Sequence, residues 1–257
     1  MAVPPDGLRS PVRPSVLVFA GLDPSGGAGI AADIEAIAAQ GAHALPIVTA
    51  LTVQDNNRVR GMEPVSDLLL TRQAGLLAGS VAIAAVKIGI PGNRANAEAI
   101  ADVVRHLRET HPGLPVVLDP VLASGHGDAL ARGDALQALE PLLDVATVLV
   151  PNLPEAAALG ERLQRCPHVL VTGGHGDGSE VVNRWTSGAG TREWRWPRLP
   201  GEFHGSGCTL AASIAARLAL GDAIAQALER GQRYCNQSLA DSYAIAPGQR
   251  IPRRIHP

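Results

Sequence analysis

The chain has 257 residues, enough for one large α/β domain with a sizeable core. A formal charge of −2 and an aromatic content of only 3% argue against a surface that attracts nucleic acid, stacks on its bases or binds anionic membranes. The three cysteines form no CxxC pair, so neither a zinc site nor a redox motif is predicted, and such a sparse set is typical of a reducing cytosol.

Residues 1–14 are interrupted by prolines and lack the apolar core of a signal peptide. We expect them to form a flexible tail. The most apolar window, residues 81–90, is short and contains Lys87, so we expect no transmembrane helix. Together with the cysteine usage, these features predict a cytoplasmic protein without a membrane partner.

Short apolar runs alternate with longer segments whose apolar residues recur at helical spacing, as in Ile30, Ile34 and Ile37. The expected strands are 16–20, 46–50, 82–88, 115–119, 147–150 and 169–172. The expected helices between them are 28–40, 67–79, 93–109, 133–143 and 154–163. This alternation predicts an α/β fold with three layers (α/β/α) around a mostly parallel central sheet.

The rhythm changes after residue 176. Residues 179–186 and 191–196 are expected to form a hairpin, followed by a helix after Gly205 and a last helix over 223–243. Because no long linker interrupts the chain, we predict a single domain over 15–246 and an irregular tail over 247–257.

Ligands bind beyond the carboxyl ends of the strands in open parallel sheets. Polar or glycine-rich loops follow five of the expected strands, at 21–27, 52–56, 119–121, 151–155 and 173–175. Their convergence predicts an active site at this edge. The first loop lacks GxGxxG spacing, and the chain lacks a GxxxxGK[ST] motif, so a dinucleotide site and a P-loop are both disfavoured.

The segment from His204 to Thr209 reads HGSGCT and leads directly into an apolar helical pattern. Glycines permit a tight turn, and the first amides of a helix are free to donate to an anion. Gly205, Ser206, Gly207 and Cys208 are therefore candidates for a phosphate or oxyanion cradle. Cys208 is either a small buried side chain or, with its pKa lowered at a helix terminus, a nucleophile, although only His204 is close enough in sequence to activate it.

Four polar residues outside this turn are candidates with structural alternatives. Asp33 is either a solvated acid in the first turns of its helix or a ligand contact, and Gln54 either reads the edge of a heterocycle or belongs to a turn. Asp119 and Glu155 are either helix caps or carboxylates that hold Mg²⁺ together with phosphate oxygens.

Several segments together resemble the hydroxymethylpyrimidine/phosphomethylpyrimidine kinases of thiamine biosynthesis, in the ribokinase-like superfamily. They are GLDPSGGAGIAADI, KIGI, VVLDPVL, VPNLPEAAAL, VLVTGGH and HGSGCT, in this order between residues 15 and 220. Cysteine at the end of the glycine-rich turn, here Cys208, is characteristic of these kinases, whereas most of the superfamily has aspartate there.

The resemblance implies a ribokinase-like fold and an enzyme that uses ATP and Mg²⁺ to phosphorylate an aminopyrimidine and then its monophosphate. The implied contacts with the pyrimidine are Gly21, Asp33, Thr52 and Gln54, so we expect Asp33 and Gln54 to share one pocket. The implied contacts with the nucleotide are Asn152, Thr172 and Gly174, with Glu155 and Asp119 near the metal. The implied anion hole is Gly205, Ser206, Gly207 and Cys208.

Two departures from the family pattern concern positive charge. Thr172 and Gly125 lie where family members often carry lysine, so either an arginine, Lys87 or the metal compensates, or one of the two phosphorylation steps is weaker. A pyridoxal-type kinase of the same superfamily and a non-catalytic pyrimidine sensor remain alternatives. The oligomeric state is also open, with a homodimer as one option.

Overall fold

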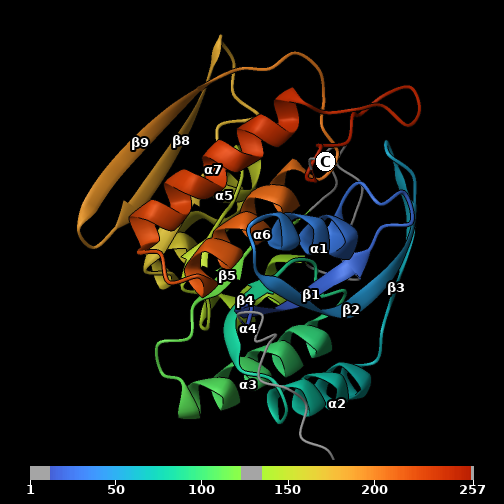
Figure 1. The fold of residues 1–257 in the computed structure, drawn as a ribbon, viewed down its shortest axis with the longest axis vertical. Coiled ribbons are helices and arrows are strands. Elements are labelled where there is room, and N and C mark those ends of the chain that lie inside the picture. Colours follow the sequence, from blue (N-terminus) through green and yellow to red (C-terminus); the bar gives the residue numbers. More distant parts are fainter. Residues whose placement is uncertain (1–11, 123–134, 256–257) are drawn as a thin grey trace, which may run out of the picture.

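In the computed structural model, which describes residues 12–122 and 135–255, a nine-stranded sheet forms the centre of the protein (Figure 1). The strand order is β3-β2-β1-β4-β5-β6-β7-β8-β9. The strands are β1 (Ser15–Leu22), β2 (His43–Gln54), β3 (Val59–Pro64), β4 (Ile83–Ile88), β5 (Val116–Leu118), β6 (Val148–Leu149), β7 (His168–Val171), β8 (Glu180–Ser187) and β9 (Gly190–Pro197). Strands β1, β2 and β4 to β7 are parallel, and β3, β8 and β9 are antiparallel additions at the two edges.

Helices cover both faces of the sheet, which confirms the predicted three-layer fold. They are α1 (Gly29–Ala39), α2 (Asp67–Ala78), α3 (Arg94–Thr110), α4 (Ala135–Leu143), α5 (Leu153–Leu159), α6 (Ser206–Ala219) and α7 (Ile224–Ala240). One apolar core joins the sheet to α2, α3 and α4, and a second joins its other face to α1, α6 and α7 (Figure 1).

Strand β1 shows why its residues form a central strand. Leu17 and Phe19 point into the core under α2 and α3, whereas Val16, Val18 and Ala20 point into the core under α1 and α6. All five are almost completely buried, as expected for a parallel strand that is covered on both faces. The strand delivers Gly21 to the edge of the sheet at which the predicted site lies.

Two differences between the structure and the sequence-based prediction have clear physical causes. Strand β3 was not predicted, because its residues are half-buried or exposed on both faces and carry no apolar alternation. Helix α5 ends at Leu159, short of the predicted 163, because Gly160 takes a left-handed φ of 54° and the chain continues as a 3₁₀ helix over Gly160–Arg165.

The segment after residue 246 contains no helix, but its described part is packed against the domain. Gln249, Ile251 and Arg254 are buried, and isolated β-bridges join Phe203 to Arg250 and Tyr243 to Ile251. Within the described ranges, none of the helices is long and apolar enough to cross a membrane.

Leu70 and Leu76 of α2 provide a matched test of the core. Leu70 is 1% exposed and packs in the core under the sheet, whereas Leu76 is 77% exposed. We expect Leu70→Ala to lower the free energy of unfolding by about 2–5 kcal/mol and Leu76→Ala to lower it by about 0.5 kcal/mol or less. Denaturant titration of both variants measures this difference, and equal losses would contradict the assigned orientation of α2.

Candidate active site

A cavity of about 510 Å³ lies at the carboxyl ends of the parallel strands, where the sequence predicted a site. Loops after β1, β2, β5, β6 and β7 converge on it, and the first turn of α6 forms part of its wall. The predicted site residues that line it are Gly21, Thr52, Gln54, Asp119, Asn152, Glu155, Thr172, Gly174, Gly205, Ser206, Gly207 and Cys208. Asp33 is the exception.

The turn before α6 requires glycine. Gly205 caps the helix with a φ of 81°, and a Cβ at this position would lie 2.0 Å from the Gly27 carbonyl oxygen. Helix α6 begins at Ser206, so the amides of its first turn have no intrahelical acceptor and border the cavity. Gly207 faces Asp119, because a Cβ on Gly207 would lie 3.7 Å from both carboxylate oxygens. The turn therefore offers free donors opposite a carboxylate.

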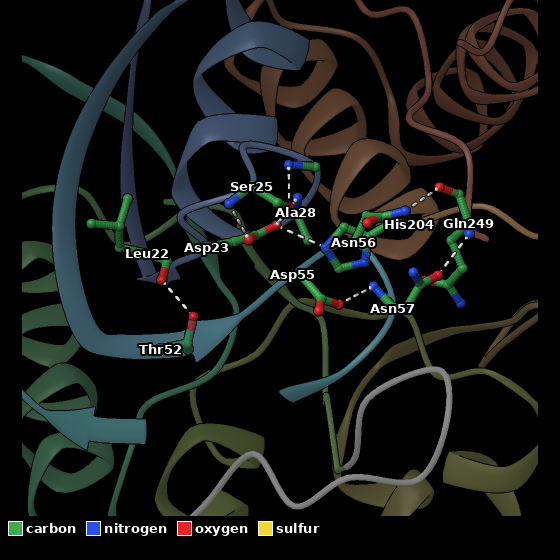
Figure 2. Close-up of polar contacts among 12 residues, drawn as sticks. Leu22, Asp23, Ser25, Ala28, Thr52, Asp55, Asn56, Asn57, His204 and Gln249 are labelled. Carbon is green, nitrogen blue, oxygen red and sulfur yellow. Dashed lines mark hydrogen bonds and ion pairs between the residues drawn. The ribbon is translucent and has the colours of Figure 1, made fainter. Parts of the chain in front are cut away.

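The buried carboxylate of Asp23 fastens the first glycine-rich loop to this turn (Figure 2). Its Oδ1 accepts the Ser25 amide at 2.8 Å, and its Oδ2 accepts the Ser25 hydroxyl and the Ala28 amide, each at 2.8 Å. His204 Nε2 lies 2.7 Å from the same Oδ2. Although burial alone raises the pKa of Asp23, its hydrogen bonds to His204 and Ser25 lower it overall, so the carboxylate stays ionised.

This pair was not predicted. Asp23 and His204 each border a glycine-rich segment, which is the only signal the sequence carried. They are far apart in the chain, and neither sits in a local pattern that names the other as its partner.

Asp33 corrects the prediction. Its side chain is fully buried, lies outside the cavity wall, and forms an ion pair with Lys87 Nζ at 2.8 Å. Asp33 is therefore neither a solvated acid nor a residue that shares a pocket with Gln54. The prediction was wrong because α1 turns Asp33 toward β4, where the chain's only lysine lies.

Lys87 reaches the cavity wall from β4 and concentrates positive charge there. Burial lowers the pKa of Lys87, but the nearby Asp33, Cys208 and Asp119 raise it more, so the net shift is upward. In contrast, burial and the Asp119 charge raise the pKa of the half-buried Cys208 to about 12, despite the opposing effect of Lys87. Loss of hydration on burial therefore acts against the lowering expected at the helix terminus, and the net shift of the Cys208 pKa is upward. Cys208 is a neutral thiol at neutral pH.

Two buried carboxyl groups, those of Asp119 and Glu155, border the cavity and interact electrostatically. Burial raises the pKa of Asp119 to about 6, and burial together with the Asp119 charge raises that of Glu155 to about 8. Glu155 is also a helix cap, because its Oε2 accepts the Asn152 amide and its own amide donates to Asn152 Oδ1, both at 2.9 Å. Glu155 therefore takes part in capping α5, and it also borders the cavity, so its expected role near a metal stays a prediction.

A divalent cation fits this end of the cavity. Asp119 Oδ2 is buried and has no hydrogen-bond partner among the described residues, and a cation would relieve the repulsion that raises both pKa values. No cluster of three or more His, Cys, Asp or Glu side chains suited to a metal occurs in the described part of the chain. Asp119 and Glu155 alone suit Mg²⁺, which takes its remaining ligands from water and phosphate oxygens.

The opposite end of the cavity is formed by β1 and β2. The Thr52 hydroxyl donates to the Leu22 carbonyl at 2.8 Å (Figure 2). The Gln54 side chain is partly exposed and borders the cavity. A Cβ on Gly21 would lie 2.5 Å from Ile90 Cδ1, so a larger residue at this position would displace the Ile90 side chain.

Arg198 contacts the loop that follows Thr172, the position at which family members often carry lysine. Its guanidinium donates to the Gly178 carbonyl at 2.8 Å and to the Gly174 carbonyl at 2.7 Å, and it borders the same cavity. Arg198 therefore supplies positive charge at this loop, although its donors are occupied by backbone carbonyls. Gly125, the other such position, lies outside the described residues.

Fold and site together define a phosphoryl-transfer enzyme of the ribokinase-like class. The family model for phosphomethylpyrimidine kinase matches residues 23–252. A hydroxymethylpyrimidine/phosphomethylpyrimidine kinase from Rhizobium meliloti is 35% identical over 267 residues, which cover 93% of this chain and 96% of that protein. This chain belongs to the phosphomethylpyrimidine kinase family.

Two further comparisons define the limits of this similarity. The thiamine biosynthesis multifunctional protein ThiED of Corynebacterium efficiens is 34% identical over 93% of this chain, which spans only 34% of that longer protein. An ADP complex of Bacillus subtilis pyridoxal kinase has a TM-score of 0.83 and 22% identity, covering 94% of this chain and 97% of that one. The second comparison establishes the fold alone.

The raised pKa of Glu155 makes stability depend on pH. Between its ordinary pKa of 4.5 and the folded value of about 8, the folded protein retains a proton that the unfolded chain releases. Without added metal, stability should therefore fall as pH rises through this interval, by up to about 1.4 kcal/mol per pH unit. Glu155→Gln, which can still cap α5, should flatten this dependence in denaturant titrations. The exposed Glu161→Gln is the control, and an unchanged slope in Glu155→Gln would refute the assignment.

Proposed function

We propose that this protein is an ATP-dependent hydroxymethylpyrimidine and phosphomethylpyrimidine kinase that acts in thiamine biosynthesis. The observation that carries the proposal is the free-donor turn at Gly205–Cys208, set opposite Asp119 in one cavity that also contains Gln54. Family membership supports the choice of substrate. The hydroxymethyl oxygen of the substrate forms a bond to the γ-phosphorus of ATP as the bond from that phosphorus to the bridging oxygen of the β-phosphate breaks. ADP is the leaving group, and the hydroxyl proton passes to solvent.

The turn stabilises the phosphoryl group in transit. The first amides of α6 donate to its oxygens, and Lys87 supplies a buried positive charge close to Asp119 and Cys208. Because such transition states are loose, charge stabilisation and alignment matter more than a strong base. This agrees with Cys208, whose thiol is protonated at neutral pH.

The two ends of the cavity bind different substrates. Gln54 and Thr52, beside Gly21, contact the aminopyrimidine, and Asn152, Thr172 and Gly174 contact the nucleotide. Asp119 and Glu155 hold Mg²⁺, which neutralises phosphate charge when it is bound. Asp33 acts only through Lys87, because its carboxylate is ion-paired to that residue.

The decisive experiment measures ADP release with the aminopyrimidine, its monophosphate and pyridoxal as acceptors. We expect the aminopyrimidine and its monophosphate to support turnover with a higher kcat/KM than pyridoxal. Preference for pyridoxal would favour the other kinase class, and absence of turnover with any acceptor would favour a sensor.

Gln54→Ala should raise KM for the aminopyrimidine by about fivefold or more, the cost of an unpaired polar group. An unchanged KM would exclude Gln54 from the pyrimidine site.

Glu155 provides a test of the metal. We expect Glu155→Gln to raise the Mg²⁺ concentration needed for half-maximal activity by about tenfold, because metal affinity depends on carboxylate charge. In wild type, the increase in melting temperature on adding Mg²⁺ and ADP should be larger above the pKa of Glu155 than below it, since protons compete with the metal. If Glu155→Gln lowered only thermal stability and left the metal requirement unchanged, Glu155 would be a helix cap alone.

Variants of Cys208 and Gly207 distinguish the role of the backbone amides in the turn from the role of the side chains. We expect Cys208→Ala to keep at least about a tenth of the wild-type kcat, because the amide survives the change. Gly207→Val should lose more, because its methyl groups would occupy the space in front of Asp119. A covalent phosphoryl intermediate on Cys208, or a folded, ATP-binding and inactive Cys208→Ala, would refute this role.

A further inference from the structure

The carboxyl-terminal segment 247–254, here called the C-terminal strap, contacts the loops that build the site. It forms hydrogen bonds with the loop after β2: Asn56 Nδ2 donates to the Gln249 carbonyl at 3.1 Å, and Asn57 Oδ1 accepts the Gln249 amide at 2.9 Å (Figure 2). The His204 amide donates to the Arg250 carbonyl at 2.9 Å, immediately before the anion turn. The strap therefore joins parts of the site that come from opposite ends of the sequence.

Arg254, the last residue of the strap, makes its contacts inside the protein. Its side chain is fully buried, and its Nε donates to Thr209 Oγ1 at 2.8 Å. Nη2 donates to the Gly27 carbonyl, and Nη1 pairs with Glu35 at 3.1 Å. One planar guanidinium thus holds the glycine-rich loop, the first turn of α6 and helix α1 together.

Two of these bonds bracket Gly205. The Thr209 hydroxyl, which accepts from Arg254, donates in turn to the Gly205 carbonyl at 2.8 Å. The Gly27 carbonyl, which also accepts from Arg254, is the atom against which Gly205 packs so closely that no Cβ fits. Arg254 consequently restrains the peptide on which the direction of the free amides depends.

We propose that Arg254 is a positioning residue for phosphoryl transfer: through Gly27 and Thr209 it holds the Gly205 turn in the orientation that receives the γ-phosphate. The proposal rests on the proposed kinase function. Arg254 does not border the cavity, so it acts through the turn and not by contact with substrate. A purely structural arginine would affect melting temperature alone.

The experiment compares Arg254→Gln with Arg253→Gln, since Arg253 lies in the same strap but is exposed. Below the melting temperature of both variants, Arg254→Gln should lower kcat about tenfold or more, with KM for the pyrimidine within about twofold of wild type. Arg253→Gln should match wild type in both constants. A kcat for folded Arg254→Gln within about twofold of wild type would overturn the proposal.

Thr209 supplies a second test that remains valid if Arg254→Gln does not fold. Thr209→Ser keeps the hydroxyl that links Arg254 to Gly205, and Thr209→Val removes it at similar volume. We expect a loss of kcat in Thr209→Val and near-normal kcat in Thr209→Ser. In the double variant Arg254→Gln/Thr209→Val, the losses should be less than multiplicative, because both changes break one linkage. Wild-type kcat in Thr209→Val, or fully multiplicative losses, would count against the linkage.

Binding of the non-hydrolysable nucleotide AMP-PCP, measured by calorimetry without acceptor, separates this inference from the proposed function. Arg254→Gln should bind AMP-PCP about fivefold or more weakly than Arg253→Gln, while the affinities of both variants for AMP stay alike. If wild type phosphorylated no acceptor, the kinase proposal would fail while this comparison still decided the role of Arg254. Equal AMP-PCP affinities of the two variants would overturn the proposed role of Arg254.

Discussion

The contact between the Gly27 carbonyl and Gly205 is the constraint on which the rest of the site depends. The two backbones approach so closely that a Cβ on Gly205 would lie 2.0 Å from the oxygen. Such proximity is possible only between glycine-rich segments, and it sets the first turn of α6 directly against the loop after β1. Two further interactions hold these segments together: the contact between Asp23 and His204, and the hydrogen bond from Arg254 to the Gly27 carbonyl.

Charge in the site is organised around a single lysine. Lys87 is fully buried, is paired with Asp33 at 2.8 Å, and its positive charge acts to lower the pKa of Asp33, Asp119 and Cys208. Burying an ion pair costs desolvation energy. The Asp33–Lys87 pair is therefore better explained by the positive charge that it supplies to the cavity than by a contribution to stability. Because Asp33 holds the Lys87 ammonium in place, the positive charge that acts on Asp119 and Cys208 cannot move toward solvent.

The family resemblance and the bottom-up reading of the residues agree on most of the site, for a physical reason. Parallel strands end at one edge, so every polar loop that follows such a strand is brought to the same cavity. Gln54 and Asp119 were singled out on this basis, Asn152 and Thr172 were assigned from the resemblance, and all four border the cavity. Asp33 failed because it lies on a helix, where the side-chain direction depends on the neighbouring strand and not on a strand end.

Sequence alone determined the layers, the parallel sheet and the glycine turn, because these follow from local apolar periodicity and from the backbone freedom of glycine. It did not determine strand β3, whose residues are only partly buried, or the burial of Arg254. Only the tertiary structure decided the pairs Asp23–His204, Asp33–Lys87 and Arg254–Gly27. Each joins segments that are distant in the chain, and the identity of such a partner depends on how helices and strands pack rather than on any local pattern.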